Sequence, residues 1–179
     1  MIAPRSQETV KIEHCKDLKK AIESACRMLS IREHSKKQLV LKLLKKGFSQ
    51  DVIEPCLQYV ISENWLCEKR FCNSYIRSKA NKGLGALRIT QELKQQNIDQ
   101  TVIDTEFKNE AVDWQALCKK HLLKKIRIIS STKSYSMNSP VTDIGKKDEN
   151  FRLKLENFLR YRGFSNEEIQ IAMNQSFAN

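Results

Sequence analysis

The feature that most constrains the fold of this chain is a helix–turn–helix pattern that occurs three times. Its first copy spans residues 35–61, where apolar residues recur at helical spacing from Leu39 up to Gly47. Phe48 follows the glycine, and a second apolar run begins at Val52. A glycine just past a helix end can adopt the left-handed conformation, and the apolar residue after it packs against the last turn. The stretch therefore predicts two α-helices joined by a tight turn.

The same turn recurs at two later points of the chain, as Asn97-Ile98-Asp99 and as Gly163-Phe164-Ser165. Asparagine is the residue that tolerates the left-handed conformation best after glycine. We expect three copies of one helical unit, and because units of this size bury little apolar surface alone, we expect neighbouring copies to share a core. The flanking core positions that align are Leu39 with Ile89 and Leu155, Leu43 with Leu93 and Leu159, Ile53 with Ile103 and Ile169, and Leu57 with Phe107 and Met173.

Composition supports an all-α fold. The 179 residues include 5 glycines and 3 prolines and carry few signals of β-hairpins. We predict a flexible lead-in at residues 1–16 and three repeats of three helices each at residues 17–64, 65–112 and 113–179. The third repeat carries an inserted surface loop at residues 130–147, which is rich in Ser, Thr and Asn.

Capping residues predict where several helices begin. Ser35 and Ser165 precede apolar runs, and Gln38 and Glu168 lie at the spacing of a capping box. Pro55 lies beyond the first turn of its helix and is expected to kink or delay it. The expected helices include residues 17–32, 68–81, 86–96, 100–110, 151–162 and 166–176, one helix on each side of Gly47, and one that begins at Asp113.

Several function classes lack support in the sequence. No apolar run has the length of a membrane span and the N-terminus has no signal-peptide core, so we expect a soluble, cytoplasmic protein. The 6 cysteines form no CxxC pair and no zinc-type spacing, which predicts reduced thiols, no metal and no other cofactor. Gly83 and Gly85 predict a helix end and a turn rather than a phosphate cradle. Glu92 and Asp104 fall at solvent-facing positions, so we do not expect an enzyme.

The net charge of +11 predicts an acidic partner, either nucleic acid or an acidic protein surface. Basic residues recur outside the apolar stripes, and no acidic residue occurs between Asp113 and Asp143. Glu106 and Glu110 are expected to be exposed acids outside the basic surface. A DNA-reading helix-turn-helix is a competing interpretation, although helix packing alone accounts for the pattern. The candidate partner-binding residues are Arg70, Arg77, Lys79, Lys82, Arg88, Lys119, Lys120, Lys124 and Lys125.

A set of motifs in the first two repeats identifies a family. The set comprises Leu29, Arg32-Glu33-His34-Ser35, Leu39, Leu43 and Lys46-Gly47-Phe48, then Leu66, Arg70-Phe71, Tyr75-Ile76-Arg77-Ser78-Lys79, Gly83, Gly85, Arg88-Ile89, Glu92-Leu93 and Ile98. With these residues the chain, over about residues 18 to 175, resembles the RecX family of regulatory proteins, modulators of the RecA recombinase. Cys67 stands where the family often has an acidic residue, and Asn64 and Asn97 stand where it often has glycine.

The resemblance implies both an architecture and a function. It implies an elongated, curved array of three three-helix repeats that binds, as a monomer, in the groove of the RecA filament on single-stranded DNA. Binding would inhibit the ATPase, strand-exchange and coprotease activities of RecA in recombination and DNA repair. The alternative is a general basic helical nucleic-acid-binding protein that acts without RecA, for which we expect DNA binding with a steep salt dependence.

Overall fold

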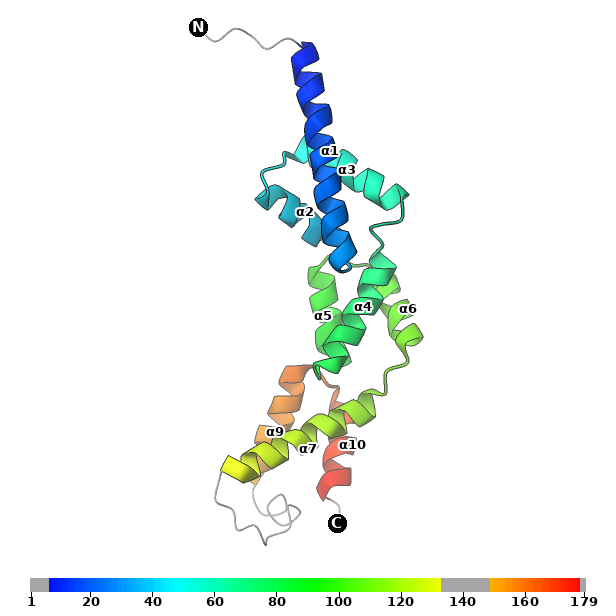
Figure 1. Cartoon of the computed structure of the whole chain (residues 1–179). Helices are drawn as coiled ribbons and strands as arrows, with labels where there is room; N and C mark the ends of the chain where they lie inside the picture. The colour runs from blue at the N-terminus through cyan, green and yellow to red at the C-terminus, as the bar shows by residue number, and fades with distance from the viewer. Residues whose placement is uncertain (1–6, 133–148, 178–179) are drawn as a thin grey trace. The chain divides into compact units, whose positions relative to one another are not determined.

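The structure, a computed structural model, describes residues 7–132 and 149–177, and all regular secondary structure in these ranges is α-helical (Figure 1). The predicted all-α fold is confirmed. Most of the loop predicted at residues 130–147 lies outside the described residues, and residues 130–132 form the end of α7. The helices are α1 (Gln7–Ile31), α2 (Lys36–Lys45), α3 (Gln50–Ser62), α4 (Glu68–Asn81), α5 (Ala86–Gln95), α6 (Gln100–Glu110), α7 (Trp114–Thr132), α9 (Glu149–Arg162) and α10 (Asn166–Phe177).

The start of the first helix differs from the prediction. The flexible lead-in was expected to extend to residue 16, whereas α1 begins at Gln7. Once a packed segment has nucleated a helix, each further residue adds a backbone hydrogen bond at little cost. The helix can therefore extend beyond the segment that carries the apolar stripe, and periodicity alone does not mark its first residue.

Pro55 does not delay α3, which begins directly after Ser49 and continues through the proline to Ser62. A proline ring removes one backbone donor from the helix and leaves the carbonyl four residues earlier without that partner. Here that carbonyl belongs to Asp51, which is exposed to solvent. Water can therefore replace the missing bond. The expectation that Pro55 delays the helix is wrong.

The two predicted capping boxes are realised to different extents. At α10 the backbone N–H of Glu168 donates to Ser165 Oγ over 3.2 Å, and the N–H of Ser165 donates to Glu168 Oε2 over 2.8 Å, so the box is complete. At α2 the backbone N–H of Gln38 donates to Ser35 Oγ over 3.0 Å. The side chain of Gln38 accepts a hydrogen bond from Arg32 Nη1 instead, over 3.3 Å.

All three predicted turns adopt the left-handed conformation. The backbone φ angle is 88° at Gly47, 61° at Asn97 and 87° at Gly163. After α2, the N–H of Gly47 donates to Leu44 O over 2.9 Å and the N–H of Phe48 donates to Leu43 O over 3.3 Å. These bonds close the helix end and satisfy carbonyls that would otherwise lack partners.

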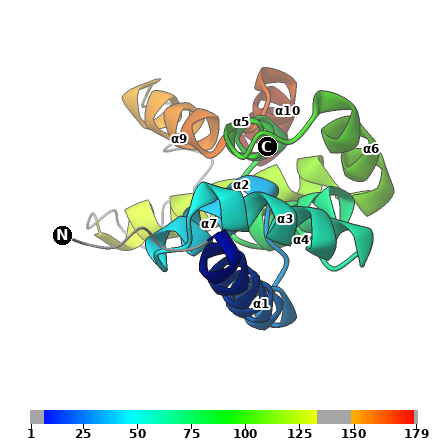
Figure 2. The same cartoon turned by 90° about the horizontal axis from the view of Figure 1, so that it is seen from above.

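The chain divides into two compact units, Met1–Ser74 with Gln95–Ile103 and Tyr75–Lys94 with Asp104–Asn179. In the first unit α1 packs against both α2 and α3 (Figure 1, Figure 2). Their apolar stripes face one another and exclude water from a single cluster. The buried residues of this cluster are Ala21, Ala25, Leu39, Leu43, Val52, Ile53, Cys56, Leu57, Val60 and Leu66.

In the second unit α7 packs against α9 and α10. Apart from Leu66, each of the two clusters draws its buried residues from one repeat. A core shared between neighbouring repeats stays a prediction. Of the aligned core positions, all are buried except Phe107, which is half-buried. The cluster of the second unit, between α7, α9 and α10, contains the buried residues Cys118, Leu122, Ile126, Phe151, Leu155, Leu159, Phe164, Ile169, Ala172, Met173 and Phe177.

Within the second unit, two turns meet at a close backbone contact that requires glycine. The N–H of Gly85 donates to Arg162 O over 2.8 Å, and the N–H of Leu87 donates to Gly163 O over 3.1 Å. A Cβ atom at Gly163 would lie 2.3 Å from Arg88 Cβ, and one at Gly85 would lie 2.3 Å from Gly163 O. The α4–α5 turn is thereby held against the α9–α10 turn.

The burial pattern predicts that truncation of two nearby leucines of α2 has very different effects on the free energy of unfolding. Leu39 is fully buried, whereas Leu41 is 50% exposed. Leu39→Ala should lower the free energy of unfolding by about 2–5 kcal/mol because it leaves a cavity in the core. Leu41→Ala should change it by less than about 1 kcal/mol. Urea denaturation followed by circular dichroism measures both, and equal losses would contradict the assigned core.

Gly47 and Gly163 allow the cost of a positive φ to be measured separately from the cost of a steric clash. Gly47 and Gly163 have nearly the same φ, but a Cβ at Gly47 would have no atom within 4 Å. Gly47→Ala should therefore cost about 1–2 kcal/mol of stability through φ alone. Gly163→Ala should cost about 1–3 kcal/mol more, because Arg88 must move. Thermal denaturation of both variants tests this difference, and similar melting temperatures would show that the turns do not require close contact.

Candidate anion-binding surface

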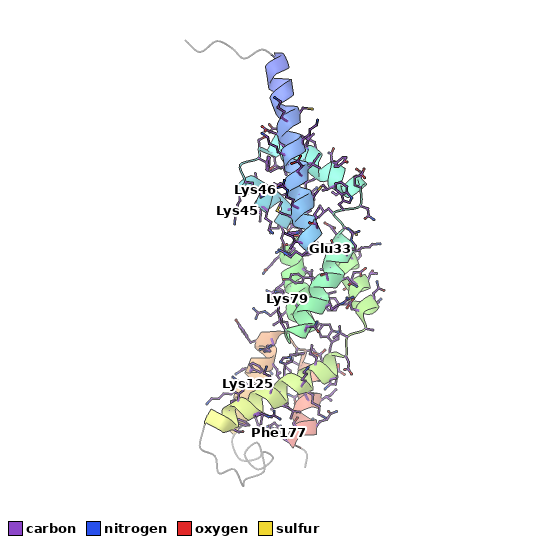
Figure 3. All side chains as sticks on the ribbon, in the orientation of Figure 1. Glu33, Lys45, Lys46, Lys79, Lys125 and Phe177 are labelled. Atoms are coloured by element: carbon purple, nitrogen blue, oxygen red, sulfur yellow. The ribbon has the colours of Figure 1, made fainter. Side chains whose placement is uncertain are left out.

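The candidate residue Arg70 is occupied by contacts within the first unit. Its Nε donates to Glu33 Oε1 over 2.8 Å, and this ion pair raises the pKa of Arg70. Its Nη2 donates to the backbone carbonyls of Asn64 and Trp65 over 2.8 and 3.0 Å. Arg70 thus holds the α3–α4 connection to the end of α1, where Figure 3 labels Glu33. Binding of a partner to Arg70 would therefore compete with these internal contacts.

Two further candidates converge on one carboxylate in the second unit. Lys79 on α4, labelled in Figure 3, donates to Glu92 Oε2 over 2.6 Å, and Arg88 Nε donates to Glu92 Oε1 over 3.3 Å. Tyr75 Oη also donates to Glu92 Oε2, over 2.8 Å. Basic side chains of α4 and α5 therefore converge across the Gly83–Gly85 turn, and the group at their centre is an acid.

The protonation states of this cluster follow from its hydrogen bonds. Partial burial alone would raise the pKa of Glu92, but hydrogen bonds from Lys79 and Tyr75 and the charge of Lys79 outweigh burial and lower it. Burial would likewise lower the pKa of Lys79, and its bonds to Glu92 and Tyr75 raise it instead. Glu92 is therefore ionised and neutralised locally. The expectation of a solvent-facing Glu92 with nothing to perturb it is wrong.

Arg77 forms a bidentate ion pair with Glu110 on α6. The Nη2 and Nε atoms of Arg77 donate to Oε1 and Oε2 of Glu110 over 3.0 and 3.3 Å. The side chain of Glu110 is only 10% exposed, whereas that of Arg77 is 66% exposed. Glu106 is 7% exposed and accepts from Asn109 Nδ2 over 3.4 Å. The expectation that Glu106 and Glu110 are exposed acids is therefore wrong.

Arg88 also joins two repeats of the second unit. Its Nη1 donates to Tyr161 O over 2.9 Å, and its guanidinium lies 4.7 Å from the centre of the Tyr161 ring. In return, Arg162 Nη1 donates to the carbonyls of Lys82 and Gly83 over 3.0 and 2.9 Å. These reciprocal arginine contacts reinforce the glycine turns and leave little of Arg88 for a partner.

The candidates on α7 have a different environment. The helix carries Lys119, Lys120, Lys124, Lys125 and Arg127 and no acidic residue. In the part of the chain that the structure describes, none of these five forms an ion pair. Lys120 and Lys124 are exposed and Lys119 is half-buried. Lys125, labelled in Figure 3, lies 5.1 Å from the centre of the Phe158 ring. α7 therefore presents uncompensated positive charge.

Lys82 resembles the α7 lysines more than its neighbours on α4. Its side chain is exposed, and within the described ranges no carboxylate forms an ion pair with it. Its backbone groups are engaged: the N–H donates to Lys79 O over 3.1 Å and the carbonyl accepts from Arg162 Nη1 over 3.0 Å. The nine candidates thus fall into four internally paired side chains and five whose charge has no acidic partner among the described residues.

Sequence reasoning missed a second basic helix, α2. No acidic residue occurs between Glu33 and Asp51, while Lys36, Lys45 and Lys46 are exposed. The absence of acids was used as a signal for α7 and applies here equally.

Sequence reasoning also missed the burial of His34, whose Nδ1 lies 2.8 Å from Arg32 O and whose Nε2 lies 2.7 Å from Lys42 Nζ. Burial and the positive charges of Arg32 and Lys42 lower the pKa of His34, which favours the neutral ring that can accept from Lys42.

The remaining reactive groups are not assembled into a site. Among residues 7–132 and 149–177, no group of three or more His, Cys, Asp or Glu side chains is placed to hold a metal ion. The cysteines are free thiols, and burial raises the pKa of Cys56 to about 11 and that of Cys118 to about 12. No helix within the described ranges has both the length and the apolar character to cross a bilayer.

Comparison with known proteins finds one family throughout. Family models described as the first and second three-helix domains of RecX match residues 21–59 and 68–105. The regulatory protein RecX of Vibrio campbellii is 32% identical over 151 residues, covering 84% of this chain and 88% of that protein. The RecX of Pseudomonas entomophila is 33% identical over 146 residues, covering 82% and 84%.

Solved structures agree on the fold. The crystal structure of RecX from Lactobacillus salivarius has a TM-score of 0.69 at 20% identity and covers 92% of this chain and 99% of that chain. Another crystal structure of a regulatory protein RecX has a TM-score of 0.75 at 21% identity and covers 96% and 80%. The similarity supports an array of three-helix repeats.

The Glu92 cluster predicts a specific loss of stability. Glu92→Gln removes the charge shared by Lys79 and Arg88 and should lower the free energy of unfolding by about 1–3 kcal/mol at neutral pH. The matched change Glu54→Gln, at an exposed position of α3, should change it by less than about 0.5 kcal/mol. Urea denaturation of both variants is the measurement, and equal effects would remove the structural role of Glu92.

The pH dependence follows from the same carboxylate. The folded-state pKa of Glu92 lies below its ordinary value of 4.5, so its contribution is present above about pH 4.5 and is lost as pH falls through the folded pKa. Wild type should therefore lose more stability than Glu92→Gln between pH 7 and about pH 3. Parallel pH profiles for the two proteins would contradict the lowered pKa.

Proposed function

The chain belongs to the RecX family of regulatory proteins, and from that premise we propose that it binds the RecA filament on single-stranded DNA and inhibits it. The proposed targets are the ATPase, strand-exchange and coprotease activities of RecA, during recombination and DNA repair in the cytoplasm. The relationship to named RecX proteins over 84% of the chain carries the proposal. In this role the protein is a monomeric regulator without catalysis of its own.

The charge distribution supports an anionic partner. The net charge is +11, and the cations of α7 form no ion pair with any residue that the structure describes. A filament of protein and DNA presents phosphates and acidic side chains, which attract such a surface over roughly a Debye length of 8 Å at physiological salt. Attraction of this kind accelerates association and orients the partner.

The ion pairs divide the proposed contact residues into two groups. The primary contact is formed by five lysines that have no ion pair within residues 7–132 and 149–177 for binding to break: Lys82, Lys119, Lys120, Lys124 and Lys125. Arg70, Arg77, Lys79 and Arg88 contribute less, because each already holds a carboxylate. Of these four, Arg77 remains the most accessible to a partner.

The alternative function, general nucleic-acid binding without RecA, is also favoured by the acid-free α7. The two proposals differ in what the protein needs. A regulator of RecA binds assembled filaments more tightly than free single-stranded DNA, whereas a general binder has similar affinities for DNA with and without RecA. A general binder should also show a steep loss of affinity with salt on free DNA.

Adding the protein to preformed RecA filaments and following ATP hydrolysis tests the proposal. We expect ATP turnover to fall as the protein is added. Addition of the protein should not change the melting temperature of RecA without DNA. Unchanged ATP hydrolysis at concentrations that saturate free single-stranded DNA would favour the alternative.

The lysines of α7 should matter more than lysines elsewhere. The double variant Lys120→Glu with Lys124→Glu should reduce inhibition by about an order of magnitude or more, because attraction toward an acidic partner becomes repulsion. Its helical circular dichroism and melting temperature should remain near those of wild type, since both residues are exposed. Titration of ATP hydrolysis against each protein gives the comparison.

A charge-matched control separates position from net charge. Lys94→Glu with Lys154→Glu changes the net charge equally at exposed positions of α5 and α9. This control should retain most of the inhibition. If both double variants lose inhibition to the same degree, the effect belongs to total charge and the α7 contact is not supported.

A further inference from the structure

A small pocket opens in the second unit between α4, the α6–α7 connection and the first turns of α7. Its volume is about 290 Å³. Apolar side chains contribute much of the lining, from Ala80, Val112, Ala116 and Leu117, while Arg77 and Lys120 add positive charge. Such a volume, close to the lower end of small-molecule sites, suits one apolar side chain of a partner.

The acids near the pocket are already engaged. Glu110 pairs with Arg77. Asp113 also lines the pocket, and its Oδ1 accepts from the backbone N–H of Ala116 over 2.8 Å as the cap of α7. Lys120 has no ion-pair partner in the described part of the chain. The pocket therefore combines a partly apolar lining with the positive charge of Lys120, which no described carboxylate pairs.

The exposed face of α7 continues this character away from the pocket. Lys120, Leu123, Lys124 and Arg127 recur at helical spacing on one face, and Leu123 and Ile128 are each 48% exposed. Apolar side chains beside lysines add nothing to the attraction of phosphates. They do complement a protein segment that carries both apolar and acidic side chains.

Nucleic acid is a poorer fit to the pocket itself. Proteins that hold single strands without sequence preference stack bases on aromatic rings, and no described residue of the lining is aromatic. A phosphate would meet Lys120 but would leave the apolar lining residues uncovered. A leucine-sized side chain flanked by carboxylates satisfies both parts of the site.

We infer that this pocket is a docking site for an acidic protein segment that inserts one apolar side chain against Ala116 and Leu117. Carboxylates of the same segment lie against Lys120, Lys124 and Arg127. The inference deepens the proposed function and rests on it, since it assigns α7 to the protein component of the filament rather than to the DNA.

Two substitutions at exposed Ala116 close the pocket without altering the core. Ala116→Trp fills it with an indole ring. Ala116→Glu places a carboxylate at its mouth, at a position three residues after the Asp113 cap where glutamate favours the helix. Gln170→Trp, at an exposed position of α10 outside the pocket, is the matched control. Melting temperatures of all three should stay close to that of wild type.

The first measurement uses a fluorescein-labelled peptide of alternating Glu and Leu and needs no RecA. Fluorescence anisotropy should show about tenfold weaker binding to Ala116→Trp and Ala116→Glu than to wild type and Gln170→Trp. A peptide with Ser in place of Leu should bind wild type more weakly. Failure of the Glu-Leu peptide to bind wild type, or equal binding to wild type and Ala116→Trp, would overturn the inference.

The second measurement distinguishes protein from nucleic acid. A labelled oligothymidine should bind Ala116→Trp as tightly as wild type, because that change leaves the charge of α7 intact. An equal loss of oligothymidine and peptide affinity would assign the pocket to nucleic acid and overturn the inference.

The third measurement, inhibition of ATP hydrolysis by preformed RecA filaments, separates the two proposals. Ala116→Trp should inhibit about tenfold more weakly than Gln170→Trp. If both inhibit equally, the pocket inference falls and the proposed function stands. If wild type does not inhibit, the proposed function falls, and the peptide measurement still decides whether the pocket binds an acidic segment.

Discussion

The structure depends on a backbone conformation that most residues avoid. Each predicted turn places one residue at positive φ directly after a helix, and that residue reverses the chain so that the next helix can pack against the last. Glycine adopts this conformation without strain, and asparagine does so at small cost. Because the turn also closes the carbonyls of the helix end, the same residue ends one helix and orients the next.

Repetition of the turn does not make its copies equivalent. Gly47 needs glycine only for its φ, since open space surrounds the position of a Cβ. Gly163 needs glycine for its φ and for contact, because Arg88 lies where a side chain would begin. A residue shared by the repeats for local reasons has thus become, in the third copy, part of the contact between two turns of the second unit.

The sequence predicted those features that depend on neighbouring residues. Helical spacing predicted α4 and α6 and the burial of Leu39, Ile89 and Leu155, because an apolar stripe is a local property. The partners of charged side chains were not predictable in the same way. Glu92 meets Lys79 and Tyr75 from another helix, and Glu110 meets Arg77 across many residues of chain. Only the packing of the helices brings these groups together.

This limit explains why the candidate surface needed revision. A single sequence reveals how many cations a segment has, but a cation is available to attract a partner only if no internal acid neutralises it. On α7 the absence of acids in the helix itself, with no ion pair from elsewhere in the described residues, leaves the charge available. On α4, Arg70, Arg77 and Lys79 belong to internal ion pairs, and a partner would have to break them.

The two kinds of contact on α7 should respond differently to the solution around them. Lysine attraction is screened by salt and falls away within a few Debye lengths, so it governs how quickly an acidic partner arrives. Burial of an apolar side chain in the pocket beside Ala116 and Leu117 is little affected by moderate salt and governs how long the partner stays. A surface that used charge alone would hold any polyanion. The apolar pocket gives α7 a means to prefer a protein segment over bare nucleic acid, because only the protein can fill it.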